Sequence, residues 1–362
     1  APAWGDAGVI VPWTIYEAYG DTRILKRHYA AMQRWIEYIR GANPDCIWRN
    51  HSNNNFGDWL NINDDTPRDV LATAYYAYDC MLMAQIAGAL DKSADQHAYA
   101  SLYHSIRTAF DAAFLGTDGR IEGDTQTCYV LALRFHLLPP ALETQAANRL
   151  SELIRARSNH LSTGFVGTGY LLPTLTANRE IDLAYRLLNN TTFPSWGFSI
   201  KQGATTIWER WDGWTPQHGF QDPGMNSFNH YAFGAVGQWL YSTVAGISFD
   251  PARPGYRRIL MQPQPGGGIR WVRAYYHSIH GRIGSSWKVQ NRRLTWSIRI
   301  PANCSALVTI PTSSLRLVTD SGHPIAGDPG VRYLGGGRGV IRLQVGSGAY
   351  HFESAAPIAA GH

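Results

Sequence analysis

Residues 22–41 read TRILKRHYAAMQRWIEYIRG, and the spacing of their apolar side chains decides the fold class. Arg27 and Glu37 fall between the apolar positions, and Gly41 comes just after the last one. The apolar positions recur at alternating intervals of four and three residues: Leu25, Tyr29, Met32, Ile36 and Ile39. This interval repeats one face of a helix with about 3.6 residues per turn, and glycine is a typical residue after a helix end. The segment therefore predicts an amphipathic helix that buries one stripe.

The helical pattern continues to about residue 245, in segments separated by turns. Thr66-Pro67-Arg68-Asp69 predicts a helix start, with Thr66 as the N-cap and Pro67 in the first helical position. Further helical stretches fit residues 124–137, 141–157, 166–176, 179–190 and 227–244. Because short links join consecutive helices into hairpins, a solenoid or a closed ring of helix pairs is expected, and the lack of a fixed-period repeat weighs against the solenoid.

After residue 250 the pattern becomes that of short strands. Leu294–Ile300 and Ile341–Val345 alternate apolar and polar residues with a period of two, which is typical of half-buried strands. Turns rich in Gly and Pro separate these runs. We therefore predict two domains, a mainly α helical domain over residues 1–249 and an antiparallel β-sandwich over residues 250–356.

Composition narrows the class of protein. Hydrophobic residues make up 44% and charged residues 16% of the chain, so a folded core is expected. The net charge of +5 is spread without a long basic run, which argues against a nucleic-acid partner. No run reaches about 18 consecutive apolar residues, so we expect no membrane partner. Compartment and oligomeric state are left open.

The sequence gives no sign of a metal or a cofactor. Cys46, Cys80, Cys128 and Cys304 are widely separated, which favours buried lone thiols over a disulfide framework or a zinc site. No His, Asp or Glu grouping has a convincing metal-ligand spacing, and there is no phosphate-binding or dinucleotide-binding motif. We therefore expect no metal and no cofactor.

The candidate chemistry lies in residues 192–231, which read TFPSWGFSIKQGATTIWERWDGWTPQHGFQDPGMNSFNHY. Glu209 lies there between Trp208 and Trp211, and a carboxylate crowded by indole rings loses solvation, which suits it to proton transfer. The alternative is a surface glutamate beside structural tryptophans. His230 lies in the same stretch and is either a core residue or a functional one.

Glycoside hydrolysis needs a second carboxyl group, because one protonates the leaving oxygen while the other activates water or attacks directly. Asp6 follows Trp4-Gly5, and Asp58 precedes Trp59, so each of these carboxylates has a tryptophan nearby. Either aspartate could instead hydrogen-bond the hydroxyls of a substrate or cap a helix.

Several runs of the chain resemble glycoside hydrolase family 78, the bacterial α-L-rhamnosidases. The matching runs follow the order of the family: PAWGDAGVIVPW at 2–13, GDWL at 57–60, TGFVGTGYLLPTL at 163–175, GATTIWERWDGW at 203–214 and SFNHYAFGAVGQWLY at 227–241. The resemblance implies an (α/α)6 barrel followed by a C-terminal β-sandwich. It also implies release of terminal α-L-rhamnose with inversion at the anomeric carbon.

The resemblance also assigns roles to residues. It places the general base on Glu209 and implies sugar contacts for Trp4, Trp59 and His230. The remaining implied pocket neighbours are Asp6, Asp58 and Trp211.

One departure from the family is large. The general acid of the family lies in a motif of the type RDERxxWTGD, upstream of the PAWGDA run, and no such motif occurs in this chain. We therefore expect a barrel that lacks its first helices, a general acid upstream of this chain, and weak or no activity of the chain alone. The alternatives are a non-catalytic carbohydrate-binding protein and another (α/α)6-barrel glycosidase or lyase.

Overall fold

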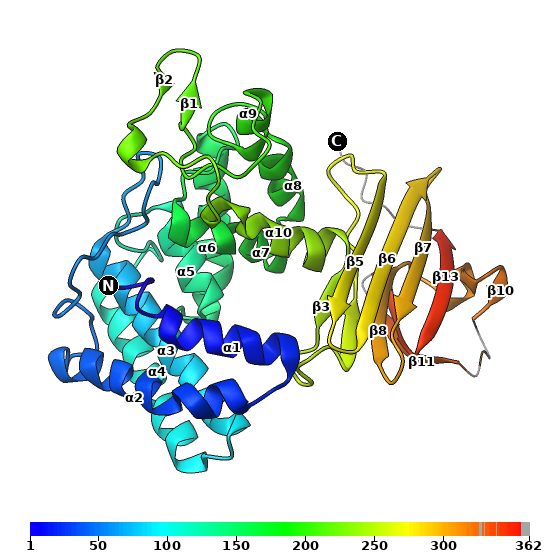
Figure 1. Cartoon of the computed structure of the whole chain (residues 1–362), viewed down its shortest axis with the longest axis horizontal. Helices are drawn as coiled ribbons and strands as arrows, with labels where there is room; N and C mark the ends of the chain where they lie inside the picture. The colour runs from blue at the N-terminus through cyan, green and yellow to red at the C-terminus, as the bar shows by residue number, and fades with distance from the viewer. Residues whose placement is uncertain (326–327, 329, 338, 356–362) are drawn as a thin grey trace. The chain divides into compact units, whose positions relative to one another are not determined.

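The computed structural model describes residues 1–325, 328, 330–337 and 339–355. The chain forms two compact units (Figure 1). The helical unit comprises Ala1–Trp13 and Thr22–Val236, and the sandwich unit comprises Thr14–Asp21 and Gly237–His362. The second half of the first helix thus belongs with the strands. The predicted end of the sandwich domain at residue 356 lies outside the described residues.

The helical unit is built from consecutive helices that pack in pairs (Figure 1). Their bounds are α1 Ala7–Tyr19, α2 Arg23–Ala42, α3 Arg68–Ala89, α4 Ser93–Phe114, α5 Gln126–Arg134, α6 Pro140–Ala156, α7 Phe165–Ala177, α8 Ile181–Asn189 and α9 Trp196–Lys201. α3, α5 and α7 pack side by side, and α4, α6 and α8 each cover one of them. The inner helices are buried over most of their surface, whereas each outer helix buries one stripe, as a two-layered helical barrel requires.

The predicted amphipathic stripe is confirmed in α2, where all five of its apolar residues are buried. The predicted start of the next helix is wrong in detail. α3 begins at Arg68 after Pro67, and Thr66 does not cap it. Instead the Thr66 hydroxyl is buried and hydrogen-bonds the Thr125 hydroxyl at 2.7 Å. The tertiary partner, which no local pattern reveals, decides the role of this threonine.

The predicted helix over 227–244 is also wrong at its beginning. Helical structure begins at Ala232 and passes from a 3₁₀ turn, Ala232–Ala235, through α10, Val236–Trp239, to a π turn, Leu240–Val244. Residues 227–230 form a loop, because the carbonyl of Ser227 and the N–H of His230 hydrogen-bond the backbone of Glu209 and Ile207. α1 was not predicted, since Pro12 lies inside it and proline normally ends a helix.

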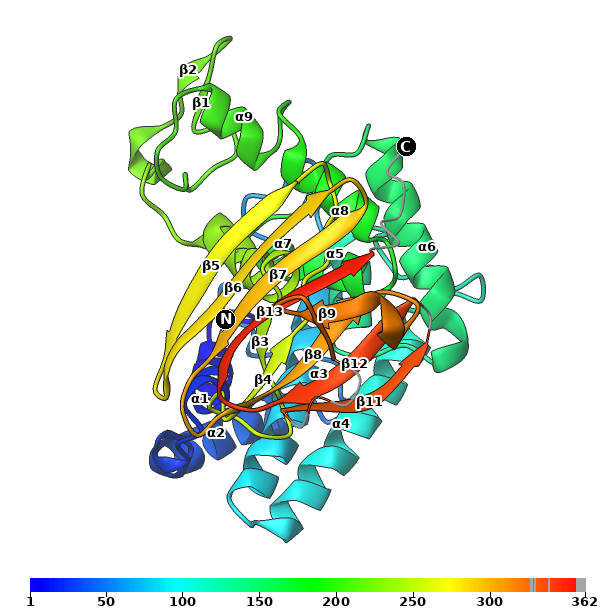
Figure 2. The ribbon, with the colours of Figure 1, turned by 90° about the vertical axis from the view of Figure 1, so that its right-hand side faces the viewer.

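The sandwich unit consists of two sheets, seen in Figure 2. One sheet has the order β10-β9-β13-β7-β6-β5 and the other the order β11-β12-β8-β4-β3. The bounds are β3 Ile247–Phe249, β4 Arg258–Met261, β5 Trp271–Ser278, β6 Gly281–Gln290, β7 Arg293–Ile300, β8 Ser305–Pro311, β9 Val318–Asp320, β10 His323–Pro324, β11 Val331–Gly337, β12 Val340–Val345 and β13 Gly348–Ala355. The described pairs are antiparallel except β4 with β8, which run parallel.

The predicted alternation of β7 is confirmed, because its buried residues are every second one. Two buried indoles of this unit have hydrogen-bond partners. Trp287 donates to the carbonyl of Val244 at 2.7 Å, and Trp296 donates to Ser285 at 2.9 Å. The hydroxyl of Ser285 in turn donates to the carbonyl of Ala245 at 2.6 Å. Paired polar atoms of this kind make the burial of these large side chains favourable.

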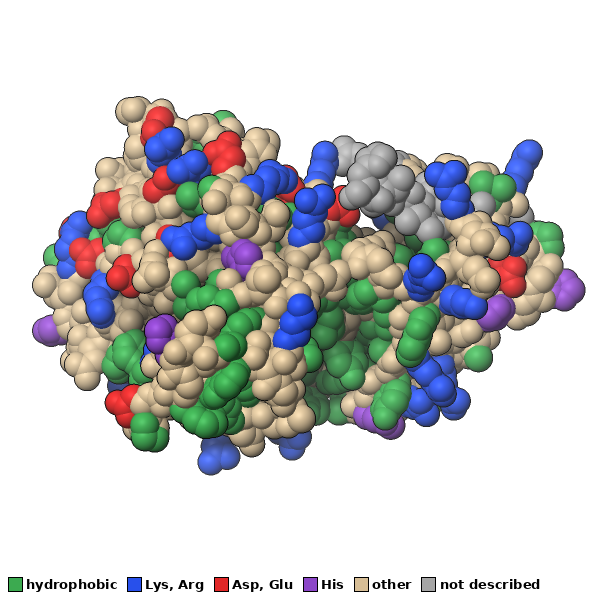
Figure 3. Space-filling model, turned by 90° about the horizontal axis from the view of Figure 1, so that it is seen from above, with side chains coloured by type: hydrophobic (Ala, Val, Ile, Leu, Met, Phe, Trp, Pro, Cys, Tyr) green, Lys and Arg blue, Asp and Glu red, His purple; other side chains and the backbone are tan. Residues whose placement is uncertain are grey.

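Two surface features complete the description. In the strand-containing part, at the right of Figure 3, Lys and Arg side chains are more frequent than Asp and Glu on the face shown. Within the described residues, no helix is both long enough and apolar enough to cross a bilayer.

Candidate active site

Glu209 lies on a loop segment whose backbone hydrogen-bonds to a second loop segment. The backbone N–H of Glu209 donates to the carbonyl of Ser227 at 2.8 Å, and the N–H of Ser227 donates to Oε2 of Glu209 at 2.8 Å. Three residues after Ser227, the N–H of His230 donates to the carbonyl of Ile207, two residues before Glu209, at 2.9 Å. This short ladder of hydrogen bonds holds together the two loop segments that carry Glu209 and His230, and it fixes one carboxylate oxygen of Glu209.

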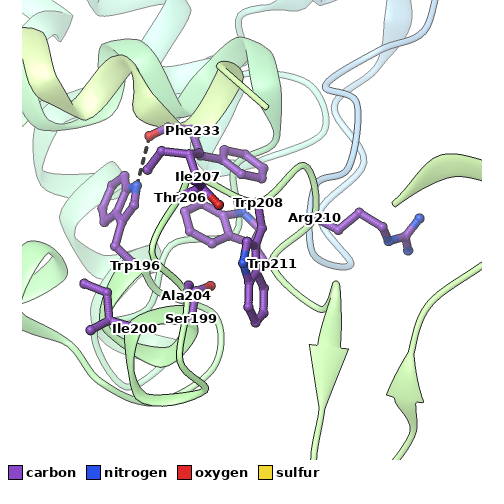
Figure 4. A pocket seen from close by; sticks show the side chains of 10 residues that line it. All are labelled: Trp196, Ser199, Ile200, Ala204, Thr206, Ile207, Trp208, Arg210, Trp211 and Phe233. Atoms are coloured by element: carbon purple, nitrogen blue, oxygen red, sulfur yellow. Dashed lines mark hydrogen bonds between the residues drawn. The ribbon is translucent and has the colours of Figure 1, made fainter. Parts of the chain in front are cut away.

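The tryptophans on either side of Glu209 pack into the core. The ring of Trp211 stacks on Phe233 at 4.0 Å between centroids and donates its N–H to the carbonyl of Thr163. Trp208 meets Phe228 edge-on at 5.0 Å. Figure 4 shows both indoles together around a cavity of about 60 Å³, whose lining does not include Glu209.

These rings therefore anchor the backbone on both sides of Glu209, whose own side chain is half-buried. Trp211 is 3% exposed. Its contacts support a role in holding the loop, whereas the resemblance implied a place in the sugar pocket. Arg210 points away from the indoles in Figure 4 and forms an ion pair with Asp212 at 3.0 Å.

His230 has a defined orientation. Its ring packs against Phe165 with centroids 5.0 Å apart, and its Nδ1 accepts the N–H of Ala232 at 3.2 Å. Because Nδ1 is an acceptor here, the neutral ring carries its proton on Nε2. His230 thus presents Nε2–H as a hydrogen-bond donor.

Trp4 and Trp59 are joined by an aromatic side chain between them. Phe56 meets Trp4 edge-on at 5.0 Å and Trp59 edge-on at 5.8 Å. Trp4 is 40% exposed and Phe56 38%, so large apolar faces of this cluster are open to solvent. The carbonyl of Trp59 accepts the N–H of Phe165, whose ring contacts His230.

A continuous series of contacts therefore links the aromatic cluster to His230, and the backbone ladder links His230 to Glu209. Phe56 and Phe165 were missed in the sequence, although Phe56 directly precedes the GDWL run and Phe165 lies in TGFVGTG. Their position inside or next to the matching runs was the available signal.

Asp58 lies beneath the aromatic cluster and is 2% exposed. Its carboxylate accepts hydrogen bonds from the N–H groups of Gly164, Val166 and Gly167 at 2.7, 2.8 and 3.1 Å, and from the hydroxyl of Thr127 at 2.5 Å. These N–H groups form the start of α7. Burial raises the pKa of the Asp58 carboxyl, and the four hydrogen bonds act in the opposite direction. The contacts support the helix-capping alternative for this residue.

Asp6 is fully buried in a second polar cluster. Its carboxylate accepts the N–H of Ala3 at 2.6 Å and the indole N–H of Trp35 at 2.9 Å. The same indole N–H lies 3.0 Å from Asp79, which hydrogen-bonds Asp6. Burial raises the pKa of Asp6, and burial together with the nearby charge of Asp6 raises the pKa of Asp79 well above its ordinary value. Asp6 therefore fixes the turn that carries Trp4.

The contacts thus divide the predicted site residues into two groups. Glu209, Trp4, Trp59 and His230 lie at least partly open to solvent, whereas Asp6, Asp58 and Trp211 are buried beneath them. In the described part of the chain, no group of three or more His, Cys, Asp or Glu could hold a metal ion. The four cysteines are free, with Cys46 half-buried and the other three buried.

Comparisons with known proteins identify the family of the chain. The model of the bacterial alpha-L-rhamnosidase 6 hairpin glycosidase domain matches residues 1–244, and the model of the bacterial alpha-L-rhamnosidase C-terminal domain matches residues 246–323. An alpha-L-rhamnosidase of Streptomyces avermitilis is 47% identical over 308 residues, which cover 85% of this chain and 29% of that protein. An alpha-L-rhamnosidase of Formosa agariphila is 36% identical and covers 97% of this chain and 38% of its own length.

Solved structures show the same relationship. The crystal structure of the Streptomyces avermitilis alpha-L-rhamnosidase complexed with L-rhamnose matches with a TM-score of 0.91 and 42% identity, over 98% of this chain and 33% of that chain. The structure of the alpha-L-rhamnosidase from Aspergillus terreus matches with a TM-score of 0.85 and 30% identity, over 98% of this chain and 39% of that chain. The chain spans about a third of the length of the relatives that it matches.

Proposed function

Since the chain belongs to the bacterial α-L-rhamnosidase family, we propose that it carries the general-base side of a site that hydrolyses terminal α-L-rhamnosides. The observation that supports this most directly is the setting of Glu209. Its Oε2 is fixed by the N–H of Ser227, and among the described residues no donor hydrogen-bonds to Oε1. A carboxylate held by one oxygen can direct the other at a water molecule.

In the proposed reaction, Oε1 of Glu209 removes a proton from water while the water oxygen attacks the anomeric carbon of rhamnose. The bond to the leaving oxygen breaks on the opposite face, so the product has the inverted configuration. The leaving oxygen takes a proton from a general acid. We place that acid outside these 362 residues, because they contain no RDERxxWTGD-type motif.

The sugar is proposed to lie against the exposed ring of Trp4 and the half-buried ring of Trp59, which offer apolar faces to its C–H groups. His230 is proposed to donate Nε2–H to one of its hydroxyls, because Nδ1 already accepts the N–H of Ala232. Asp6 and Asp58 are proposed to position the sugar-binding residues without touching the sugar, by holding the turns on which Trp4 and Trp59 lie. The substrate class is therefore a glycoside or oligosaccharide that ends in α-L-rhamnose.

Glu209→Gln tests the base. We expect it to lower the hydrolysis of an aryl α-L-rhamnoside by roughly 10²–10⁴-fold while L-rhamnose still binds, because the amide keeps the shape but takes no proton. Glu180→Gln is the matched control, since Glu180 is also half-buried but forms an ion pair with Arg155 in another part of the unit. Unchanged turnover in Glu209→Gln would exclude this residue as the base.

Two further measurements separate the alternatives. Proton NMR of the first product should show the β anomer, and the α anomer would rule out inversion. A panel of aryl glycosides should show preference for the rhamnoside, and preference for another sugar would favour a different (α/α)6-barrel glycosidase. Rhamnose binding without any hydrolysis, even of an activated rhamnoside, would favour a non-catalytic carbohydrate-binding protein.

A further inference from the structure

The outward face of the six-stranded sheet carries side chains that the fold does not require. In β5 every second residue is exposed, and Trp271 is 68% and Tyr275 49% exposed. Exposed aromatic rings of this size leave a large apolar area in water. We call this surface the basic aromatic face, and it comprises Trp271, Arg273, Tyr275, Arg282, Lys288 and Arg299.

The strand register brings these residues together. Trp271 lies opposite Lys288, and Tyr275 lies opposite Gly284, which in turn lies opposite Arg299 on the next strand. Gly284 has no side chain to fill the space between Tyr275 and Arg299. Residues along a strand rise about 3.3 Å each, so the face extends over roughly 20 Å along β6, from Arg282 to Lys288.

The cations of this face are not neutralised by carboxylates. Among the described residues, none of its four Lys and Arg side chains forms an ion pair with Asp or Glu. Glu353 on β13 is the one carboxylate that faces outward beside them. It lies 3.4 Å from Arg293 and 3.8 Å from His351, with which it can pair. The face therefore attracts an anion.

The aromatic ring at its centre is held in place. The guanidinium of Arg282 lies over the ring of Tyr275, 4.3 Å from its centroid, and His277 meets the same ring edge-on at 5.4 Å. Such a stack fixes a planar guanidinium without using its hydrogen-bond donors on a carboxylate. Guanidinium groups recognise carboxylates with two parallel hydrogen bonds, which favours a ligand bearing carboxylates.

We propose that the basic aromatic face binds an acidic polysaccharide, a chain of uronic acid units, in addition to any rhamnoside bound at the candidate active site. Aromatic rings offer surface to the sugar units, and the four cations pair with their carboxylates. A single-stranded nucleic acid would also meet aromatics and positive charge. We favour a saccharide because the same chain carries the proposed rhamnoside-binding site. The choice of a saccharide over a nucleic acid therefore rests on the proposed function.

Binding of polygalacturonate to the whole chain at low ionic strength tests the proposal, with neutral galactan and a single-stranded DNA oligonucleotide as comparison ligands. We expect polygalacturonate to bind, galactan not to bind, and added salt to weaken the complex. Tyr275→Ala and Arg282→Gln should each weaken binding about tenfold, as for the loss of an anchoring aromatic or arginine side chain.

Tyr333→Ala and Arg332→Gln on β11 of the other sheet are the matched controls, since Tyr333 is 49% exposed, the same as Tyr275. They should leave binding unchanged, as should Glu209→Gln, so that failure of the base assignment does not affect this result. Equal binding of galactan, or full binding by both face variants, would overturn the proposal. Binding of DNA but not of polygalacturonate, lost in the same variants, would also overturn it and make the face a nucleic-acid site.

Discussion

A carboxylate next to a tryptophan in the sequence can hold the backbone of a site without touching the ligand. Asp58 precedes Trp59, yet its oxygens meet three backbone N–H groups and one hydroxyl at the start of α7. Asp6 likewise holds the N–H of Ala3 beside Trp4. Burial and donor count, which require the folded chain, are what distinguish such aspartates from residues that touch a ligand.

Asp58→Asn should destabilise the chain. The variant keeps one acceptor oxygen but turns an amide NH₂ towards N–H or O–H donors, which leaves buried groups unpaired. We expect the free energy of unfolding to fall by about 2 kcal/mol in urea titrations. Asp118→Asn is the control, because that carboxylate is 63% exposed and should change stability by less than about 0.5 kcal/mol. Equal effects of the two substitutions would contradict the capping role.

The Asp6–Asp79 pair gives a pH dependence with a definite sign. An acid whose pKa is higher in the folded state binds more protons when folded, so the free energy of unfolding falls as pH rises above the unfolded value of about 3.9. This loss should continue until the raised pKa of Asp79 has been passed. Asp79→Asn cannot ionise and still donates to Asp6, so its unfolding free energy should decline less between acidic and neutral pH. Parallel curves for the variant and the original chain would contradict a protonated Asp79.

At the scale of elements, periodic sequence patterns predicted the helices and strands in which one face packs on a core. The stripe of α2 and the alternation of β7 could be read because one face of each packs on a core. The start of α3 and the segment 227–231 could not be predicted in this way. Their conformation depends on hydrogen bonds between residues that are distant in the sequence, Thr66 with Thr125 and Ser227 with Glu209. The candidate site residues were predicted from the runs that resemble the family. The contacts of Phe56 and Phe165 with these residues became visible only in the folded structure.

The contact between the Trp59 turn and α7 depends on a glycine. A Cβ on Gly164 would lie 2.2 Å from the carbonyl oxygen of Trp59 and 2.6 Å from that of Asp58, and these backbone atoms cannot rotate away. Gly164→Ala should therefore lower the unfolding free energy by roughly 1–3 kcal/mol and weaken L-rhamnose binding, because Trp59 must shift.

Gly8→Ala in α1 is the matched substitution, because a Cβ there meets nothing within 4 Å. Alanine inside a helix should raise the unfolding free energy by roughly 0.5–1 kcal/mol relative to glycine. Urea titrations of both variants and calorimetric titration with L-rhamnose measure these effects. If Gly164→Ala binds the sugar as well as the original chain does, the Trp59 turn does not position the ligand.

At the scale of the whole molecule, the described chain combines the proposed base Glu209, the proposed sugar-binding aromatics Trp4 and Trp59, and the basic aromatic face. It spans about a third of the length of its relatives, and its sequence contains no RDERxxWTGD-type motif. A base without its acid partner has a specific chemical consequence. Water can still be activated, but the departing oxygen must leave without a proton, so the rate depends on how well that oxygen bears negative charge.

The isolated chain should therefore discriminate strongly between leaving groups. Dinitrophenyl α-L-rhamnoside, whose phenolate leaves unprotonated, should be hydrolysed faster than phenyl α-L-rhamnoside, with a ratio that exceeds that of a glycosidase with its general acid by roughly 10²–10⁴-fold, the usual worth of general acid catalysis. Glu209→Gln should abolish turnover of the dinitrophenyl compound, because the base acts with either leaving group. Similar turnover of both rhamnosides, lost in Glu209→Gln, would show that these 362 residues hold an acid of their own.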